Sequence, residues 1–307
     1  PGVAVSPSDR YRVETVSGLA TLLAVTRDAE GQHARLVKWF GQDPFLERPG
    51  LIRISPDYRD FEAEGQAFWW AGGFQSGDLT NLIARFATRE ALASTLTHEL
   101  THRFDGALYP SMPAWLVEGR ATFTETGTLH AESTEVREEF VAWQRLWQTG
   151  RNGYGSADGL RKLLEGRVDD YRHNYDAGYS LFTFLRRFRG FDDAQDGAAV
   201  FLPRLDAYLR SFRERARDAA EARFTVAFCD GADGRPEDFE TAGAWFGRFL
   251  REGGSGAEEP AAWKRVWMDA AQDAWNESGA RGAAPSRIFD RPTYRPSRTR
   301  HDRPDHG

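Results

Sequence analysis

Sulfur is scarce in this sequence, which has one cysteine, Cys229, and two methionines among 307 residues. A single thiol cannot form an intrachain disulfide, and it is compatible with a reducing cytosol as well as an oxidising periplasm. Cysteine usage therefore does not assign the chain to a compartment. Because Cys229 has no obvious histidine partner, we interpret it as a thiol buried in the core.

Long apolar runs are also missing. No stretch approaches the roughly 18 residues that a membrane-spanning helix requires, so we expect no transmembrane segment. The glycine-rich stretch 252–256 is not followed by Lys and Ser or Thr, so no phosphate-binding loop is indicated there. The net charge of -6 argues mildly against a nucleic-acid partner. With 40% hydrophobic and 28% charged residues, the composition is that of an ordinary globular protein.

Strand patterns are confined to the first third of the chain. Residues 1–9 are polar and are expected to be loose, whereas 11–16 and 51–54 have strand patterns on either side of a helix at 19–41. An aromatic stretch at 67–74 and a strand at 79–86 flank turn residues and predict a hairpin. From residue 88 the pattern is helical, with helices expected at 88–105, 113–129, 135–149, 156–166, 171–188, 192–213, 236–251 and 260–276.

These patterns predict an α+β fold, in which a small N-terminal α/β lobe with a short sheet precedes a mainly helical lobe. We expect the lobe at 10–87, a helical region with the candidate chemistry at 88–188, and a second helical region at 189–282. The tail at 283–307 is rich in proline and arginine and poor in apolar residues, so it is expected to be disordered. The glycine-rich connection at 252–259 should be flexible.

One motif in the helical region carries chemistry. His98 and His102 are four residues apart, which on a helix places both imidazoles on one face, within reach of one ion. Zinc in catalytic sites takes three protein ligands and keeps a fourth position for water. Glu99, next to the first histidine, is suited to accept a proton from that water without being a ligand.

A third ligand is available in Glu118, 16 residues after His102. The intervening glycine and prolines end one helix and begin another, so the second helix can return past the metal face. The alternative for Glu118 is a solvated carboxylate on an exposed helix face. The apolar residues directly before it favour the ligand interpretation.

Residues 95–102, TLTHELTH, and the later pattern PxWLxEGxA at 113–121 resemble the gluzincin zinc metallopeptidases. This clan includes thermolysin and the aminopeptidase N group, and the resemblance is closest to the bacterial peptidase MA-like families. It implies that His98, His102 and Glu118 bind Zn2+ and that Glu99 is the general base. Arg103 departs from the pattern, because the position after the second histidine is usually uncharged. We expect its long side chain to extend to solvent.

The same resemblance implies an oxyanion donor on a later helix. Tyr175 is the first candidate, with Tyr179 and His173 as alternatives. The opposing interpretation is that the aromatic residues at 171, 175, 179 and 182 simply form a core stripe.

Metal-bound histidines normally donate their second N–H to a carboxylate or carbonyl. Asp105, Thr122 and Glu125 are near enough in sequence to serve, although each also suits a surface or capping position.

For substrate, the resemblance implies that an edge strand pairs with an extended peptide, and residues 79–86 are assigned to that strand. The Gly-x-Met-Glu-Asn motif that grips a free amino terminus in the aminopeptidase N group is absent, so an aminopeptidase is not predicted. The aromatic residues 68–70 either line a specificity pocket or pack in the core.

The function predicted from these residues is that of a zinc-dependent metallopeptidase acting on a peptide or protein substrate. One alternative is a non-catalytic, zinc-stabilised binding protein on a peptidase scaffold. Another is a zinc hydrolase of a non-protein amide or ester, because the metal, base and oxyanion donor would be the same. The chain begins at Pro1 and not at methionine, and the habits of the resembled families lead us to expect a periplasmic or secreted location.

Overall fold

The computed structural model describes residues 2–45, 49–63, 71–84, 89–128, 135–167, 173–191, 197–214 and 218–252. Residues 1–260 form one compact unit, and residues 261–307 form a second. Three predicted features lie outside the described residues. They are the helix at 260–276, the tail at 283–307, and all but the first residue of the flexible connection at 252–259. The description below concerns the first unit.

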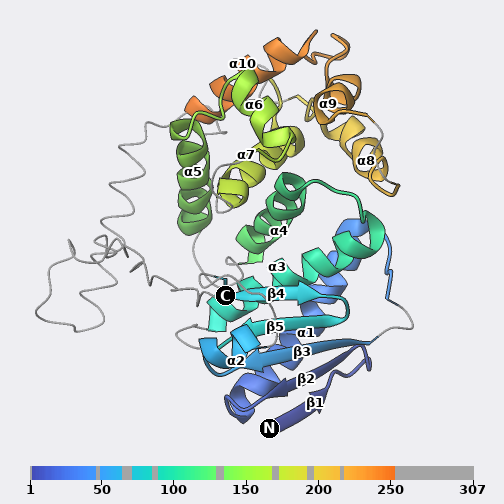
Figure 1. Cartoon of the computed structure of the whole chain (residues 1–307), viewed down its shortest axis with the longest axis vertical. Helices are drawn as coiled ribbons and strands as arrows, with labels where there is room; N and C mark the ends of the chain where they lie inside the picture. The colour runs from blue at the N-terminus through green and yellow to red at the C-terminus, as the bar shows by residue number, and fades with distance from the viewer. Residues whose placement is uncertain are drawn as a thin grey trace, which may run out of the picture. The chain divides into compact units, whose positions relative to one another are not determined.

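The N-terminal part is a mixed sheet, and its described strands number five, in the order β1-β2-β3-β5-β4 (Figure 1). Strands β2, β3 and β5 are parallel, and β1 and β4 pair antiparallel at the two edges. The strands are β1 (Gly2–Val5), β2 (Tyr11–Thr15), β3 (Gly50–Ser55), β4 (Gly73–Ser76) and β5 (Leu79–Ile83). Together with the helical region that follows, this sheet confirms the predicted α+β class.

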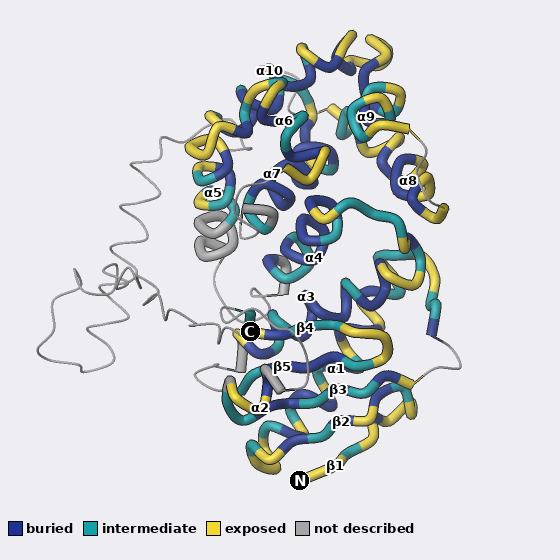
Figure 2. The backbone as a smooth tube through the Cα atoms, viewed as in Figure 1, coloured by how far each residue is buried: buried dark blue, intermediate teal, exposed yellow. Residues whose placement is uncertain are grey.

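Two expectations about this sheet were wrong. Residues 2–5 are not loose but form β1, which pairs with β2 and is largely exposed (Figure 2). The strand predicted at 79–86 is not at the edge, because β3 pairs with one side of β5 and β4 with the other. The tight turn at Gly77, where φ is 57°, folds β4 back along the outer side of β5. Among the described strands, β4 is therefore the edge on this side of the sheet, and β1 is the other edge.

Helices α1 (Leu19–Phe40) and α3 (Arg89–Leu108) pack on the sheet, and a short α2 (Tyr58–Ala63), which the sequence did not predict, contacts β3 and β5. Helix α1 ends at Gly41, where φ of 74° and a bond from its N–H to the Val37 carbonyl form a left-handed cap. The apolar core between sheet and helices is formed by Tyr11, Val13, Leu22, Val25, Ala29, Leu36, Phe45, Ile52, Ile54, Leu82, Leu92, Leu96, Leu100 and Phe104.

Arg103 departs from expectation in the same region. Its side chain does not extend to solvent, since Arg103 is only 4% exposed. The guanidinium lies 3.9 Å from the centre of the Phe45 ring, and its Nη2 lies 3.3 Å from Asp78 Oδ1. The charge is thus covered by an aromatic face and paired with a carboxylate at the β4–β5 turn.

The remaining described helices form the second part of the unit. Helix α7 is buried along most of its described length (Figure 2) and contacts α4, α5, α6, α8 and α10. The helices are α4 (Ala114–Thr128), α5 (Glu135–Arg151), α6 (Ala157–Leu164), α7 (His173–Arg187), α8 (Leu202–Arg210), α9 (Ala220–Phe228) and α10 (Phe239–Arg251). Among the described residues, no helix is both long enough and apolar enough to cross a membrane.

The helix predicted at 192–213 is shorter than expected. Its described part is α8, which begins at Leu202 with Pro203 in its first turn, where the missing N–H costs nothing. Helix α9 was not predicted. Cys229 directly follows it and is buried in the helical core, which confirms the expected core thiol. The predicted domain boundaries stay predictions.

Candidate metal centre

Helix α3 places the HExxH residues on its buried side. The imidazole rings of His98 and His102 lie one turn apart, with centroids 4.6 Å from each other. His98 is 6% exposed and Glu99 5% exposed, so the motif lies inside the molecule and not on a solvated helix face. This burial separates it from a chance match on a surface helix.

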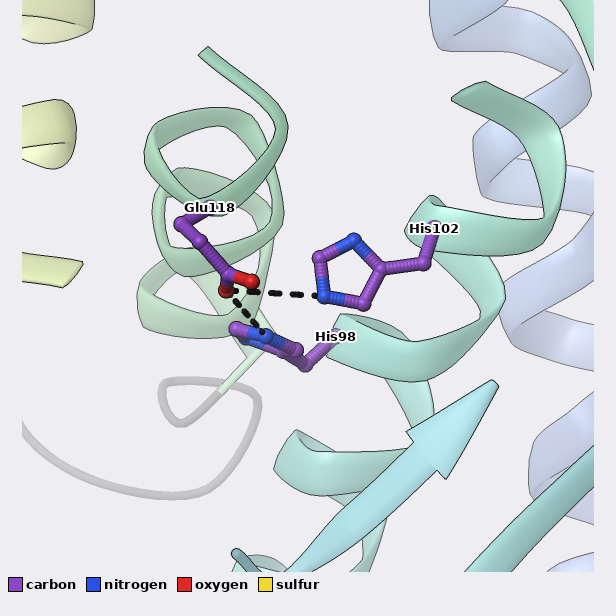
Figure 3. Close-up of side chains that lie close together, drawn as sticks. All are labelled: His98, His102 and Glu118. Atoms are coloured by element: carbon purple, nitrogen blue, oxygen red, sulfur yellow. Dashed lines mark ion pairs between the residues drawn. The ribbon is translucent and has the colours of Figure 1, made fainter. Parts of the chain in front are cut away.

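Helix α4 brings Glu118 to the same point. Pro113 precedes α4, and this helix packs against α3. The Glu118 carboxylate therefore faces the imidazoles of both His98 and His102 (Figure 3). Glu118 Oε2 lies 3.4 Å from His98 Nε2 and 3.6 Å from His102 Nε2. At 5% exposure, Glu118 is not the solvated surface carboxylate of the alternative interpretation.

These separations can be compared with what zinc requires. Zinc–nitrogen and zinc–oxygen distances of about 2.0–2.2 Å put two ligand atoms of a tetrahedral site about 3.3–3.5 Å apart. The two distances from Glu118 are close to that value. One atom from each of the three residues lies within 4.8 Å of the other two. Two imidazoles and one carboxylate are also the donor set of an open catalytic zinc site, so the residues fit the ion.

The charges around these side chains favour a cation. Burial alone would raise the pKa of Glu118, but His102 and His98 outweigh it and hold that pKa far below its ordinary value. Burial alone would lower the pKa of His98, yet bonds to Glu118 and Glu125 raise it well above normal. Carboxylates thus stabilise positive charge at the imidazoles, and a divalent ion can supply that charge in place of protons.

Glu125 orients one of the imidazoles. Its Oε2 lies 2.9 Å from His98 Nδ1, and Ser94 Oγ donates to its Oε1 at 3.2 Å. Burial would raise the pKa of Glu125, but the bond from His98 lowers it, so the carboxylate stays charged. Of the three residues predicted as possible partners for the histidines, Glu125 is the one in contact.

The other two predicted partners are buried elsewhere. Thr122 is fully buried, and its hydroxyl has no hydrogen-bond partner among the described residues. Asp105 Oδ1 lies 2.7 Å from Arg120 Nη1, and burial raises the pKa of Asp105 to about 6. No described residue bonds to His102 Nδ1.

Glu99 is held between the two histidines and the sheet edge. Strand β4 approaches it so closely that a Cβ on Gly73 would lie 2.8 Å from Glu99 Cγ. Any other residue at position 73 would therefore require the Glu99 side chain or β4 to shift. Burial raises the pKa of Glu99, although His98 and His102 partly oppose the shift. A raised pKa suits a carboxylate that must accept a proton near neutral pH and later return it.

A cavity of about 190 Å³ opens beside these groups and includes His98, Glu99, Tyr175 and Arg145 in its wall. The Tyr175 ring centre is 5.6 Å from that of His98. Tyr179, in contrast, is 2% exposed, packs on Phe123 and does not line this cavity.

The side chain of His173 and the aromatic residues 68–70 lie outside the described residues. Arg145 was not among the predicted site residues, because no motif marks it. Its Nη1 lies 2.9 Å from Asp176 Oδ1.

No protein-family model and no curated protein sequence matches the chain. Among solved structures it is similar to yeast LTA4 hydrolase in complex with bestatin, at 18% identity and TM-score 0.44, over 74% of this chain and 36% of that one. It is similar to a two-domain M1 zinc metallopeptidase mutant bound to L-arginine, at 18% identity and TM-score 0.40, over 81% and 49% of the respective chains. The same coverage and TM-score, at 16% identity, apply to an M1 zinc metallopeptidase mutant from Deinococcus radiodurans. The chain spans about a third to a half of the length of these structures.

Proposed function

We propose that the protein is a zinc-dependent metallopeptidase that hydrolyses peptide bonds, with Glu99 as general base. The observation that carries the proposal is the convergence of His98, His102 and Glu118 at separations suited to a tetrahedral zinc ion, beside a cavity that Glu99 also lines. A purely structural zinc site is closed by a fourth protein ligand and needs no neighbouring base. This distinction favours an enzyme over a zinc-stabilised binding protein.

Zinc bound by these three residues would polarise the substrate carbonyl and lower the pKa of an attacking water. Glu99 accepts the proton of that water and passes it to the departing amine, which its buried position and raised pKa favour. Glu125 keeps the His98 ring oriented, with Nδ1 bonded to Glu125 and Nε2 facing Glu118, so that Nε2 would be the atom available to a metal ion. Tyr175 donates a hydrogen bond from its hydroxyl to the oxygen that becomes negative as the carbonyl is attacked.

An extended peptide has a place to bind in this cavity. Gly72 and Gly73, at the start of β4, line it directly. The edge of β4 offers backbone groups to a peptide strand, and the lack of side chains at these glycines lets that strand approach Glu99. The strand that pairs with the substrate peptide is therefore assigned to β4, in place of the predicted strand at 79–86. A periplasmic or secreted location is part of the same proposal.

The test combines metal analysis with cleavage of a peptide library by the full chain. We expect one zinc per chain and cleavage that depends on it. Glu99→Gln should reduce hydrolysis by about 10²–10⁴-fold or more, since that is the usual contribution of a general base, while zinc stays bound. Glu237→Gln, a matched change at an exposed residue, should leave activity unchanged. Zinc at one per chain with no cleavage of any peptide would favour the binding protein, and an active Glu99→Gln variant would contradict the mechanism.

A further inference from the structure

A second cavity, separate from the metal centre, has two arginines in its wall. Its volume is about 170 Å³. Its wall is formed by the C-terminal end of α1, by residues of helices α4, α7 and α8, and by Tyr109. It shares no lining residue with the cavity at the zinc ligands. Its apolar surface comes from side chains such as Trp39, Phe40, Phe182 and Leu205. None of these residues has a role in the proposed peptidase chemistry.

The first arginine, Arg120, is only 3% exposed. Its guanidinium carbon lies 4.7 Å from the Phe40 ring centre and 5.0 Å from that of Trp39. Nη1 pairs with Asp105, but Nε has no hydrogen-bond partner among the described residues. A buried donor without a partner is costly, and one beside a cavity can be satisfied by a ligand that enters there.

The second arginine, Arg186, has no carboxylate within ion-pair distance among the described residues. Its guanidinium carbon lies 5.6 Å from the ring centres of Trp39 and of Phe123. Burial lowers its pKa, and the nearby cations Arg187 and Arg120 lower it further. An anion in the cavity would favour the charged guanidinium and so oppose both effects.

Asp206 is the carboxylate in the cavity wall. Its side chain is 63% exposed, and it pairs with Arg210 on the next turn of α8. It therefore lies at the solvent side and already has a cationic partner. Asp105 neutralises Arg120, so Arg186 remains as the guanidinium that an entering carboxylate can pair with.

We propose that this cavity binds a small monocarboxylate with an aromatic or branched aliphatic body. A guanidinium matches a carboxylate through two parallel hydrogen bonds, and the aromatic and leucine side chains accept the apolar body. A cavity of about 150 Å³ holds a benzene-sized ligand, so the volume is sufficient. Because its walls include α4 and α7, the ligand would contact the helices that carry Glu118 and Tyr175.

The test is calorimetric titration of the full chain with benzoate, and with benzamide as the neutral molecule of the same shape. We expect benzoate to bind at one site per chain and benzamide at least tenfold more weakly. Arg186→Gln should weaken benzoate binding at least tenfold. Arg187→Gln, the matched loss of charge one residue later on α7, should change it by less than about threefold, because Arg187 is exposed and does not line the cavity. Leu202→Trp, at a wall residue that is 43% exposed, should block the site without disturbing the core.

Several results would overturn the proposal. Equal binding of benzoate and benzamide would show an apolar cavity with no preference for an anion. Inorganic phosphate binding as tightly as benzoate would show a simple anion site without an apolar body. Benzoate binding that Arg186→Gln leaves unchanged would assign the anion to another place, such as the metal centre. Absence of saturable binding up to millimolar benzoate would also refute it.

Discussion

Gly119 on α4 lies directly against Gly178 on α7: a Cβ on Gly119 would be 2.4 Å from the Gly178 carbonyl carbon and oxygen. The contact is mutual, since a Cβ on Gly178 would be 3.0 Å from Gly119 N, and it would also be 2.2 Å from the Trp115 carbonyl oxygen. Gly119 follows the proposed metal ligand Glu118, and Gly178 lies one turn after Tyr175. The two glycines therefore set the separation between the helix that supplies the proposed third ligand and the helix that supplies the proposed oxyanion donor.

Substitution of Gly119 tests this contact. Gly119→Ala places a methyl group where backbone already lies, so the helices must separate, and overpacking of this kind costs about 1–3 kcal/mol. Gly106→Ala on α3 is the matched control, because Gly106 is exposed and a Cβ there meets nothing within 4 Å. In a helix, that change should stabilise by about 0.5–1 kcal/mol. Urea denaturation of both variants measures the difference, and a shift of the same sign in both would contradict the contact.

The bond between Glu125 and His98 leads to a prediction about zinc affinity. Glu125→Gln keeps the shape of the side chain but removes the charge that orients the imidazole, and loss of such a partner typically weakens metal binding about 10–100-fold. Glu118→Gln should weaken it more, since it removes a ligand. Competition with a chelator of known affinity measures both, with Glu237→Gln as the exposed control. Equal zinc affinity in wild type and Glu125→Gln would refute the orienting role.

The parts of this arrangement that the sequence could place are those encoded by local spacing. His98 and His102 are an i, i+4 pair, so helix geometry alone brings their rings together. Glu125 follows Glu118 by seven residues on one helix, so both belong to the same face.

What could not be predicted depends on contacts between distant segments. The order of strands in the sheet is not visible in any one strand, so β5 was mistaken for the edge that β4 forms. Arg145 lies 31 residues from its partner Asp176, and no motif links them. The Arg103 side chain was expected at the surface, because charged side chains are usually exposed. In the structure Phe45 and Asp78 together cover its guanidinium.

The positions of two tyrosines on α7 distinguish the proposed oxyanion donor from a core residue. Tyr175 lines the cavity beside His98, whereas Tyr179 is buried against Phe123. Tyr175→Phe should lower kcat by about 10²–10³-fold, the usual cost of one oxyanion donor, with KM and zinc content nearly unchanged. Tyr179→Phe changes a residue that does not line the cavity and should leave kcat within about threefold of wild type. Steady-state kinetics on one peptide substrate decides, and equal losses in the two variants would reject the assignment.

The buried His33 on α1 predicts how stability changes with pH. Its Nδ1 lies 2.7 Å from the Tyr11 hydroxyl and its Nε2 3.0 Å from Asp43 Oδ2. Burial lowers the pKa of His33 below its ordinary 6.5, and this outweighs the opposing effect of Asp43. Below pH 6.5 the unfolded chain therefore binds more protons at this residue than the folded chain does. The His33 contribution is present above pH 6.5 and is lost as the pH falls through the lowered pKa.

Comparison with His33→Gln isolates this contribution, because other buried groups, such as Asp105 with its raised pKa, titrate alike in both proteins. Glutamine retains a donor and an acceptor but does not titrate. Between pH 7.5 and 5.5 the wild type should lose more unfolding free energy than the variant, with an extra slope of at most about 1.4 kcal/mol per pH unit, the limit for one proton. Guanidinium denaturation at several pH values measures both slopes. Parallel slopes would mean that His33 has the same proton affinity in the folded and unfolded chains, and a steeper slope in the variant would reverse the predicted sign.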